Sequence, residues 1–513
     1  MRWCHVILSR SKACILSGEN LIRPVTLPGK ILFITPPCHC GVAEISGRWV
    51  PLNFIYLAGS AREAGVRAEI YDAMALDHGF PEIEERLRAS MADYVAVTAM
   101  TATIGDAVKT LELVKRIDPD AVTILGGVHP TFMYDELLRS TTVLDYLVIG
   151  EGEVTLHQLL TILEGGGDPA AVAGIAFRQG DEIIRTQPRA LMMSLDDLPT
   201  AWDLLEWEIY TYHIIPGSCL GAVSTSRGCD SGCRFCSQST FWERSWRGRD
   251  PRKVAEELEQ LHITYGVNVF LMVDEHPTKD RARWEEILDL LVVRQLPISL
   301  IMETRAADIV RDRDILGKYH RAGIIHVSIG VESADPGRME FLGKEQSVDE
   351  VREALQLLQD EGIVSEASFL VGFPDESAES VNQTLRQARS LNPDIANFMP
   401  LTPWPYAGIN GASVSCQRDS DYARYNLVDP VTETFGMSLS QLEGAINSCF
   451  RKFNMGKMID IMSMKDDFRR AYLLRATKLM MSSTFIMKKL GAGILGGIPA
   501  KVSEVRKKLK GDG

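Results

Sequence analysis

The sequence predicts an α/β protein with two sheet-containing domains and a mainly helical C-terminal region. The chain has 513 residues, enough for roughly two to four domains with cores of their own. Short apolar runs alternate with amphipathic stretches, a pattern typical of parallel sheets covered by helices. A loop with three closely spaced cysteines interrupts this alternation. We expect an extension at residues 1–29, a first domain at 30–165, a hairpin and linker at 166–218, a second domain at 219–405 and the helical region at 406–513.

The composition is that of an ordinary globular protein. Hydrophobic residues make up 45% of the chain and charged residues 24%, with a formal net charge of −13. This charge argues against nucleic acid as the main partner, because phosphate binding requires a basic surface. The ten cysteines form no secreted disulfide pattern, and no apolar run reaches the roughly 18 residues of a membrane span. Both observations favour a cytoplasmic protein.

The first domain is predicted to be a Rossmann-like, doubly wound parallel sheet. A helical stretch at residues 107–117, with Val108, Leu111 and Val114 on one face, represents the helices between its strands. Ligands bind such sheets beyond the carboxyl ends of the strands. The candidate strands lie at residues 31–35, 68–71, 94–98, 122–125 and 146–149.

Glycine-rich segments follow the fourth and fifth of these strands. Gly126, Gly127 and His129 follow the fourth strand, and Gly150 and Glu151 follow the fifth. Glycines let the backbone approach a flat ligand closely, so this edge is the predicted ligand site. The pattern alone leaves open a nucleotide site or a domain without a ligand. It also leaves open whether His129 contacts a ligand or only hydrogen-bonds within its loop.

A hairpin and a linker join the two domains. The hairpin is predicted from strand-like runs at residues 174–177 and 182–185 around a turn at 179–181. The linker mixes proline, acidic and aromatic residues, and we expect Trp202 and Trp207 to pack at a domain interface.

The second domain is predicted to be a six-stranded partial barrel. Asp250 is a plausible N-cap and Pro251 a plausible first residue of its first helix. Six strand–helix repeats are too few to close an eight-stranded barrel. The candidate strands lie at residues 222–226, 267–273, 298–303, 325–330, 365–371 and 395–399. Their ends carry polar or turn residues, which favours a site there over isolated solvated carboxylates: Asp274, Glu275, Glu303, Arg305, Glu332, Gly372 and Pro374.

Three cysteines follow the first strand of this domain. Cys229, Cys233 and Cys236 are spaced C-x3-C-x2-C, and thiolates select iron–sulfur clusters, zinc or copper(I). A structural zinc site takes four ligands, and a four-iron cluster normally takes four cysteines. Three thiolates therefore leave one metal position for a ligand that is not protein. The alternative is a zinc site that takes Cys219 or His213 as its fourth ligand.

The cysteine spacing, with Phe235 before the last cysteine, resembles that of the radical S-adenosylmethionine (SAM) enzymes. The resemblance implies a [4Fe-4S] cluster on the three cysteines, whose open iron chelates SAM, and a radical that removes hydrogen from an unactivated carbon. Reduction would come from a flavodoxin or a ferredoxin.

The same resemblance implies SAM contacts at the strand ends. Asp274 and Glu275 would hold the amino group, Glu332 the ribose hydroxyls, and Gly372 and Pro374 would lie near the adenine. The family often has Gly-Gly-Glu where this chain has Asp-Glu, so which acid contacts the amine stays open.

The glycine-rich segments of the first domain resemble the cobalamin-binding domain that precedes many radical SAM domains. The resemblance implies cobalamin contacts at Gly126, Gly127, His129, Gly150 and Glu151. The Asp-x-His-x-x-Gly sequence that supplies an axial histidine in some of these domains does not occur here. We therefore expect a cobalt without a protein histidine below it.

Three further stretches, at residues 39–47, 241–250 and 401–405, resemble the anaerobic magnesium-protoporphyrin IX monomethyl ester oxidative cyclases. This resemblance covers most of residues 30–491 and implies an oxidoreductase of chlorophyll biosynthesis. The aromatic and arginine residues at 241–249 are suited either to binding a porphyrin or to plain packing. One alternative is a radical SAM methyltransferase or oxidoreductase acting on another lipid or natural product. Another is a non-catalytic cobalamin or redox sensor.

The C-terminal tail is basic in an otherwise acidic chain. Residues 465–513 contain 12 Lys and Arg and four Asp and Glu. A basic amphipathic segment can contact an anionic membrane surface peripherally or cover a hydrophobic substrate. The alternative is a terminal helix packed on the barrel with a solvated basic face.

Overall fold

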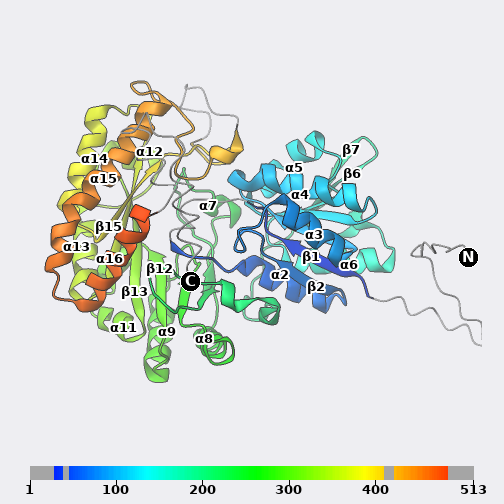
Figure 1. Cartoon of the computed structure of the whole chain (residues 1–513), viewed down its shortest axis with the longest axis horizontal. Helices are drawn as coiled ribbons and strands as arrows, with labels where there is room; N and C mark the ends of the chain where they lie inside the picture. Colours follow the sequence, from blue (N-terminus) through cyan, green and yellow to red (C-terminus); the bar gives the residue numbers. More distant parts are fainter. Residues whose placement is uncertain (1–27, 38–45, 410–420, 483–513) are drawn as a thin grey trace, which may run out of the picture.

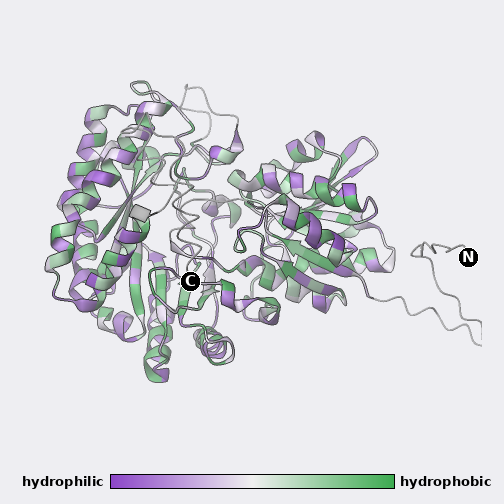
Figure 2. Cartoon of the chain, viewed as in Figure 1, coloured by the Kyte–Doolittle hydropathy of each residue, from purple (hydrophilic) through white to green (hydrophobic). Residues whose placement is uncertain are grey.

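The computed structural model describes residues 28–37, 46–409 and 421–482. Two α/β domains lie side by side, and the C-terminal helices pack on the second domain (Figure 1). The strands of both sheets are predominantly hydrophobic, and hydrophilic residues gather on the outer helices (Figure 2). Most of the predicted extension, most of the stretch at 39–47 and residues 483–513 of the tail lie outside the described residues.

The first domain contains the predicted parallel sheet. Its order is β2-β1-β3-β4-β5-β6-β7, in which the first five strands are parallel and the last two form an antiparallel hairpin. The hairpin predicted from the linker therefore extends this sheet. The strands are β1 (Lys30–Ile34), β2 (Arg67–Tyr71), β3 (Tyr94–Thr98), β4 (Val122–Gly126), β5 (Tyr146–Val148), β6 (Ile175–Gln179) and β7 (Glu182–Arg185).

Helices cover both faces of this sheet, because its strands are apolar on both sides. Ile31 and Phe33 of β1 pack with the helices α2 (Leu52–Glu63) and α6 (Glu153–Gly165). Leu32 and Ile34 face the opposite way. They share a core with the helices α3 (Phe80–Ser90), α4 (Ile104–Ile117) and α5 (Val128–Ser140). This alternation is the doubly wound arrangement that the sequence predicts.

The second domain contains six parallel strands in the order β15-β14-β13-β12-β11-β8. The strands are β8 (Leu220–Val223), β11 (Val269–Met272), β12 (Ser299–Thr304), β13 (Ile324–Glu332), β14 (Val364–Val371) and β15 (Ile395–Pro400). The helices are α7 (Gln238–Phe241), α8 (Pro251–Tyr265), α9 (Arg281–Arg294), α10 (Ala306–Arg311), α11 (Leu316–Arg321), α12 (Pro336–Leu342), α13 (Val348–Asp360) and α14 (Ala378–Leu391). The predicted six-stranded open sheet is confirmed, and Asp250 caps α8 through the Arg252 amide.

The first strand of this domain was predicted at residues 222–226, and the predicted end of this strand is wrong. β8 stops at Val223, and Ser226 and Arg227 form a separate short strand, β9, that pairs antiparallel with β10 (Arg247–Gly248). The chain turns between β8 and β9 because the buried carboxylate of Asp274 accepts hydrogen bonds from the backbone and hydroxyl of Thr225. The turn brings the cysteine loop beside the first domain.

Two long helices close the described part of the C-terminal region. α15 (Leu439–Ser463) packs against β15 and α14, and α16 (Asp467–Ser482) lies against α15. Arg469 of α16 pairs with Asp394 at 2.8 Å, and the Tyr472 hydroxyl bonds His326 of β13. The described tail is therefore a helix packed on the barrel. Within the described residues, no helix is long and apolar enough to cross a membrane.

Candidate active site between the two domains

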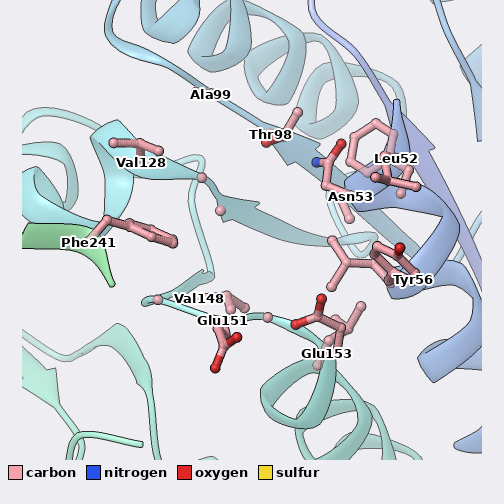
Figure 3. A pocket seen from close by; sticks show the side chains of 18 of the residues that line it. Leu52, Asn53, Tyr56, Thr98, Ala99, Val128, Val148, Glu151, Glu153 and Phe241 are labelled. Atoms are coloured by element: carbon pink, nitrogen blue, oxygen red, sulfur yellow. The ribbon is translucent and has the colours of Figure 1, made fainter. Parts of the chain in front are cut away.

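A cavity of about 460 Å³ lies where the carboxyl ends of β3, β4 and β5 meet the loop after β9. Its inner part is apolar and is lined by residues of the first sheet and its helices, including Phe33, Phe54 and Leu156. Phe241 of the second domain lies across the cavity from Tyr56 (Figure 3). Both domains therefore contribute walls to one cavity.

Two glycines shape the edge of the sheet at this cavity. Gly127 has φ of +109°, and a Cβ atom there would lie 2.4 Å from the Ala99 carbonyl oxygen. Gly150 also has positive φ, at +72°, but open space surrounds it. Gly127 is thus required by the close approach of β3 and β4, whereas Gly150 leaves room beside the cavity.

Buried ion pairs join the two domains at the mouth of the cavity. Arg227 donates to Glu151 at 3.0 Å and to Glu153 at 2.6 Å. Arg247 donates to Glu151 at 2.9 Å and to the Met192 carbonyl at 2.6 Å. Burial opposes ionisation of Glu151, but the hydrogen bonds from Arg247 and the Met192 amide hold its pKa below the usual range. Glu151, predicted as a ligand contact, thus binds the second domain.

Trp242 lies between the two arginines of this network. Its ring is within 5.8 Å of the Arg227 guanidinium and 5.5 Å of that of Arg247. Its indole N–H donates to Glu275 at 2.7 Å, and the Gly228 amide donates to the same carboxylate at 2.9 Å. The cavity wall is therefore hydrogen-bonded to the start of the cysteine loop.

The predicted acidic pair is engaged with the chain itself. The Asp274 carboxylate accepts from Thr225 and from the Ser226 hydroxyl, at 2.6–2.9 Å. The Glu275 carboxylate accepts from the Gly228 amide and the Trp242 indole. All four carboxylate oxygens of the pair therefore already accept a hydrogen bond. Burial raises the pKa of both groups. The pair holds the cysteine loop in place, and its contact with the SAM amine stays a prediction.

The three cysteines are free thiols, each half-buried, and they are near enough for Cys229 to act electrostatically on the other two. Burial opposes ionisation of Cys229, but a hydrogen bond with His276 lowers its pKa to about 7. Burial raises the pKa of Cys233 and Cys236, and the negative charge of Cys229 adds to this effect at both. Such clustered thiols are suited to a soft metal centre.

The structure does not support the alternative zinc site. Cys219 lies at the start of β8, where its sulfur is near the Trp207 and Tyr265 carbonyl oxygens. Among the described residues, the potential metal ligands that group around Cys229 are Asp230 and His276, and neither Cys219 nor His213 is with them.

His276 was missed by the sequence analysis, although it directly follows the acidic pair. It is buried, and its Nε2 is 2.6 Å from Asp308. Its ring also hydrogen-bonds with Cys229 on the cysteine loop. His276 thus connects Asp308 to the cysteine loop.

The inner side of the partial barrel carries further polar residues. Glu366 accepts from Asn397 at 2.7 Å and lies 3.1 Å from His326. The Glu303 side chain is exposed to solvent, but the protein around it removes part of its hydration, and this desolvation, followed by the negative charges of Glu366 and Glu332, raises its pKa. Glu303 has no hydrogen bond or ion pair with any described residue. It is the carboxyl group at these strand ends that remains free to meet a ligand.

The other predicted SAM contacts lie at the same edge of the barrel. Glu332 ends β13 and pairs with Lys344 at 2.8 Å. Gly372 follows β14 with φ of +104°, and its amide donates to Glu376 at 2.8 Å. Pro374 lies in the same turn and accepts a hydrogen bond from the Phe435 amide. Their roles toward SAM stay predictions.

His129 lies outside the cavity wall. It is the second residue of α5, is 1% exposed, and its Nδ1 is 3.2 Å from the Thr101 hydroxyl. Its ring packs edge-on against Tyr406 and Tyr422, and burial lowers its pKa to about 4. The cavity is lined by Val128 instead. These contacts favour the interpretation of His129 as a packed, hydrogen-bonded histidine.

The stretch at 241–249 is largely used in packing. Arg249 pairs with Glu257 at 2.5 Å, and Arg247 with Glu151. The Trp246 indole donates to the His276 carbonyl at 2.9 Å. Within this stretch only Phe241 and Trp242 line the cavity.

Comparisons with known proteins match both halves of this site. Residues 38–160 match the B12 binding domain, and residues 223–388 match the radical SAM superfamily. The anaerobic magnesium-protoporphyrin IX monomethyl ester cyclase of Rubrivivax gelatinosus is 37% identical over 474 residues, 91% of this chain and 85% of that protein. The chain belongs to the cobalamin-binding radical SAM enzymes.

Further relatives of this chain include another cyclase and a methyltransferase. The cyclase of the same name from Cereibacter sphaeroides is 34% identical over 88% of this chain and 75% of its own length. An uncharacterized methyltransferase of Pyrococcus horikoshii is 30% identical over 83% of this chain and 92% of its own. The fold is shared with the radical SAM methyltransferase TsrM of Kitasatospora setae, with a TM-score of 0.68 at 16% identity over 88% of this chain and 99% of that one.

The residues of this radical SAM enzyme fit the family's cofactors, which are cobalamin, SAM and a [4Fe-4S] cluster. Cys229, Cys233 and Cys236 supply three thiolates, one fewer than a four-iron cluster normally takes. The cavity has the size of a small-molecule site and is apolar at depth. The Tyr56 hydroxyl is buried in its wall without a partner among the described residues, as expected of a group that meets a ligand.

Proposed function

We propose that this radical SAM enzyme is an anaerobic oxidative cyclase of magnesium-protoporphyrin IX monomethyl ester. The observation that carries the proposal is the 37% identity to the Rubrivivax gelatinosus cyclase, which extends over 474 residues. The match therefore includes the cobalamin-binding half, the cysteine loop and helices beyond the barrel. The substrate would be a porphyrin whose propionate side chain loses hydrogen, closes a ring and gains a keto oxygen from water.

The cofactors, when bound, supply a radical that removes a hydrogen atom from an unactivated carbon. The chain's part is to position them and to exclude water from the site. Cys229, Cys233 and Cys236 would hold the cluster. The ion pairs of Arg227 hold the two walls of the cavity together, and Phe241 and Trp242 cover it from the side of the cluster loop. Glu303 would face the substrate or SAM inside the barrel, since it has no partner within the described chain.

A methyltransferase is the second candidate, favoured by the Pyrococcus horikoshii relative, which this chain matches over 92% of that protein's length. The two functions differ in their products from SAM and from the porphyrin. A methyl transfer adds carbon to the substrate, whereas oxidative cyclisation removes hydrogen and adds oxygen.

The test is turnover by the anaerobically reconstituted protein with SAM, cobalamin, a reductant and magnesium-protoporphyrin IX monomethyl ester. In ¹⁸O-labelled water we expect a cyclised product with one labelled keto oxygen, together with 5′-deoxyadenosine, both detected by mass spectrometry. A methylated porphyrin, or SAM cleavage without porphyrin turnover, would remove the cyclase assignment. Absence of 5′-deoxyadenosine under all conditions would favour a sensor.

A further inference from the structure

The outer face of α15 becomes apolar in its C-terminal half. Met455, Ile459 and Met462 are 70%, 77% and 65% exposed, and Met458 beside them is also exposed. Spacings of three and four residues place these side chains on one side of the helix. Phe468, exposed at the start of α16, adds to them. We refer to these five side chains as the α15 patch.

The same helix is already apolar on its inner face. Ile446, Phe453 and Ile461 are buried against the barrel and α14. A surface helix of a globular protein normally turns polar residues outward, as α15 does at Gln441 in its first turn. The second half of α15 is therefore apolar on both faces. The inner face packs in the core, whereas the apolar side chains of the outer face are exposed to solvent.

The two helices that carry the patch also carry exposed cations. Four basic side chains of α15 and α16 and the turn between them are exposed, and the structure gives them no ion-pair partner among the described residues: Lys452, Lys465, Arg475 and Lys478. Across residues 451–513 the chain has 15 Lys and Arg and five Asp and Glu, a net charge of +10. The whole chain carries −13, which leaves −23 for residues 1–450. The two helices that carry the α15 patch therefore belong to a positively charged part of the sequence.

The positive charge of this region indicates which kind of partner surface could bind the patch. A symmetric dimer through the patch would bring two like-charged surfaces together, which repel. Residues 483–513, outside the described part of the chain, have seven Lys and Arg and two Asp and Glu, so they carry the same sign of charge. An anionic lipid surface satisfies both features, because its headgroups attract the cations and its acyl boundary takes up the apolar side chains.

We propose that the α15 patch and the cations beside it dock the enzyme peripherally on an anionic membrane. Met455, Ile459 and Met462 enter the boundary between headgroups and acyl chains. Lys452 and Lys465, at the two ends of the patch, contact the headgroups. The cobalamin cavity and the cysteine loop are built from other elements, so docking leaves both intact.

The test is sedimentation of the full-length, cofactor-loaded protein with lipid vesicles. We expect binding to vesicles that contain phosphatidylglycerol and at least tenfold weaker binding to pure phosphatidylcholine, with a loss of affinity at high salt. The double variant Ile459→Glu/Met462→Glu should bind at least tenfold more weakly. The double variant Lys452→Glu/Lys465→Glu should lose binding to the anionic vesicles specifically.

Val293→Glu is the matched control, because Val293 is an equally exposed apolar residue on α9. It should bind like the parent protein. Iron and cobalamin contents of every variant report folding. Unchanged vesicle binding in Ile459→Glu/Met462→Glu, or equal binding to both lipids, overturns the proposal. A dimer in light scattering that the same variant dissociates would assign the patch to a second copy instead.

Discussion

The two halves of the active site are held by different forces. The cavity between the domains, where we expect cobalamin to bind, has walls fixed by buried ion pairs of Arg227 and Arg247 with Glu151 and Glu153. The cysteine loop is held mainly through its backbone, as in the bond from the Arg234 amide to the Leu342 carbonyl at 2.8 Å. Its thiols remain half-buried and free. The cavity is thus formed by the chain itself, while a bound cluster would add the link between the three cysteines of the loop.

Replacing the cysteines should have the largest effect of the variants of the site. It should remove the cluster while leaving the cavity able to bind cobalamin. Cys229→Ala, Cys233→Ala and Cys236→Ala should each reduce bound iron from about four atoms per chain to background and abolish SAM cleavage. Cobalamin affinity should stay within about twofold, because none of the three thiols lines the cavity. Metal analysis, 5′-deoxyadenosine formation and cobalamin titration measure the three effects.

Cys219→Ala is the control for this series. Its sulfur lies at the other end of β8, near the Trp207 and Tyr265 carbonyls, so iron content should not change. Loss of cobalamin together with iron in the cysteine variants would show that the two halves form as one unit.

The local pattern of the sequence was sufficient for the sheets and the cysteine loop. Strands such as β1 and β11 are apolar runs, and three cysteines within eight residues can be recognised before any fold is known. What the pattern could not show are contacts between distant residues. Glu151 is 76 residues from Arg227 and 96 from Arg247 in the chain. No periodicity reports such a pairing.

The same limit applies to individual site residues. The sequence left the 241–249 stretch open between porphyrin binding and packing, and the structure places Arg247 and Arg249 in ion pairs. His276 was overlooked because its partners, Cys229 and Asp308, come from two other strand ends. Side-chain type indicates which chemistry is available, but the fold decides which groups remain free for a ligand.

Breaking the ion pairs tests whether the cavity is formed by the chain itself. Arg227→Met leaves Glu153 buried without its cation, and removing one partner of a buried pair costs about 3–5 kcal/mol. We expect this loss in equilibrium denaturation followed by tryptophan fluorescence, since Trp242 lies against Arg227. Cobalamin affinity should fall as well, because the mouth of the cavity opens.

Arg62→Met is the matched control for the buried pair. Arg62 makes a two-bond pair with Asp203, but the side chains are 38% and 58% exposed, so the expected cost is at most about 1 kcal/mol. Adding Glu153→Gln to Arg227→Met should restore part of the stability, because it removes the unpaired charge. Equal losses for Arg227→Met and Arg62→Met would mean that the interdomain pairs do not hold the cavity.

Of the variants of the site, Gly127→Ala should have the smallest effect on stability. This effect should be confined to the cavity. The φ of +109° is strained for any residue with a Cβ, and that atom would meet the Ala99 carbonyl oxygen at 2.4 Å. The expected cost is about 1–3 kcal/mol, with weaker cobalamin binding because the ends of β3 and β4 must separate. Gly105→Ala, in α4 with nothing near its Cβ, should be neutral or stabilising by up to about 1 kcal/mol.

Iron content distinguishes a local effect of Gly127→Ala from a global one. The cysteine loop belongs to the other domain, and none of its three cysteines lines the cavity beside Gly127, so iron should remain at about four atoms per chain. Weaker cobalamin binding with an intact cluster would be the mirror image of the cysteine variants, in which iron is lost and cobalamin is kept. If Gly127→Ala lost both cofactors, the strained backbone would be supporting the domain interface as well as the cavity. The two halves would then not be independent.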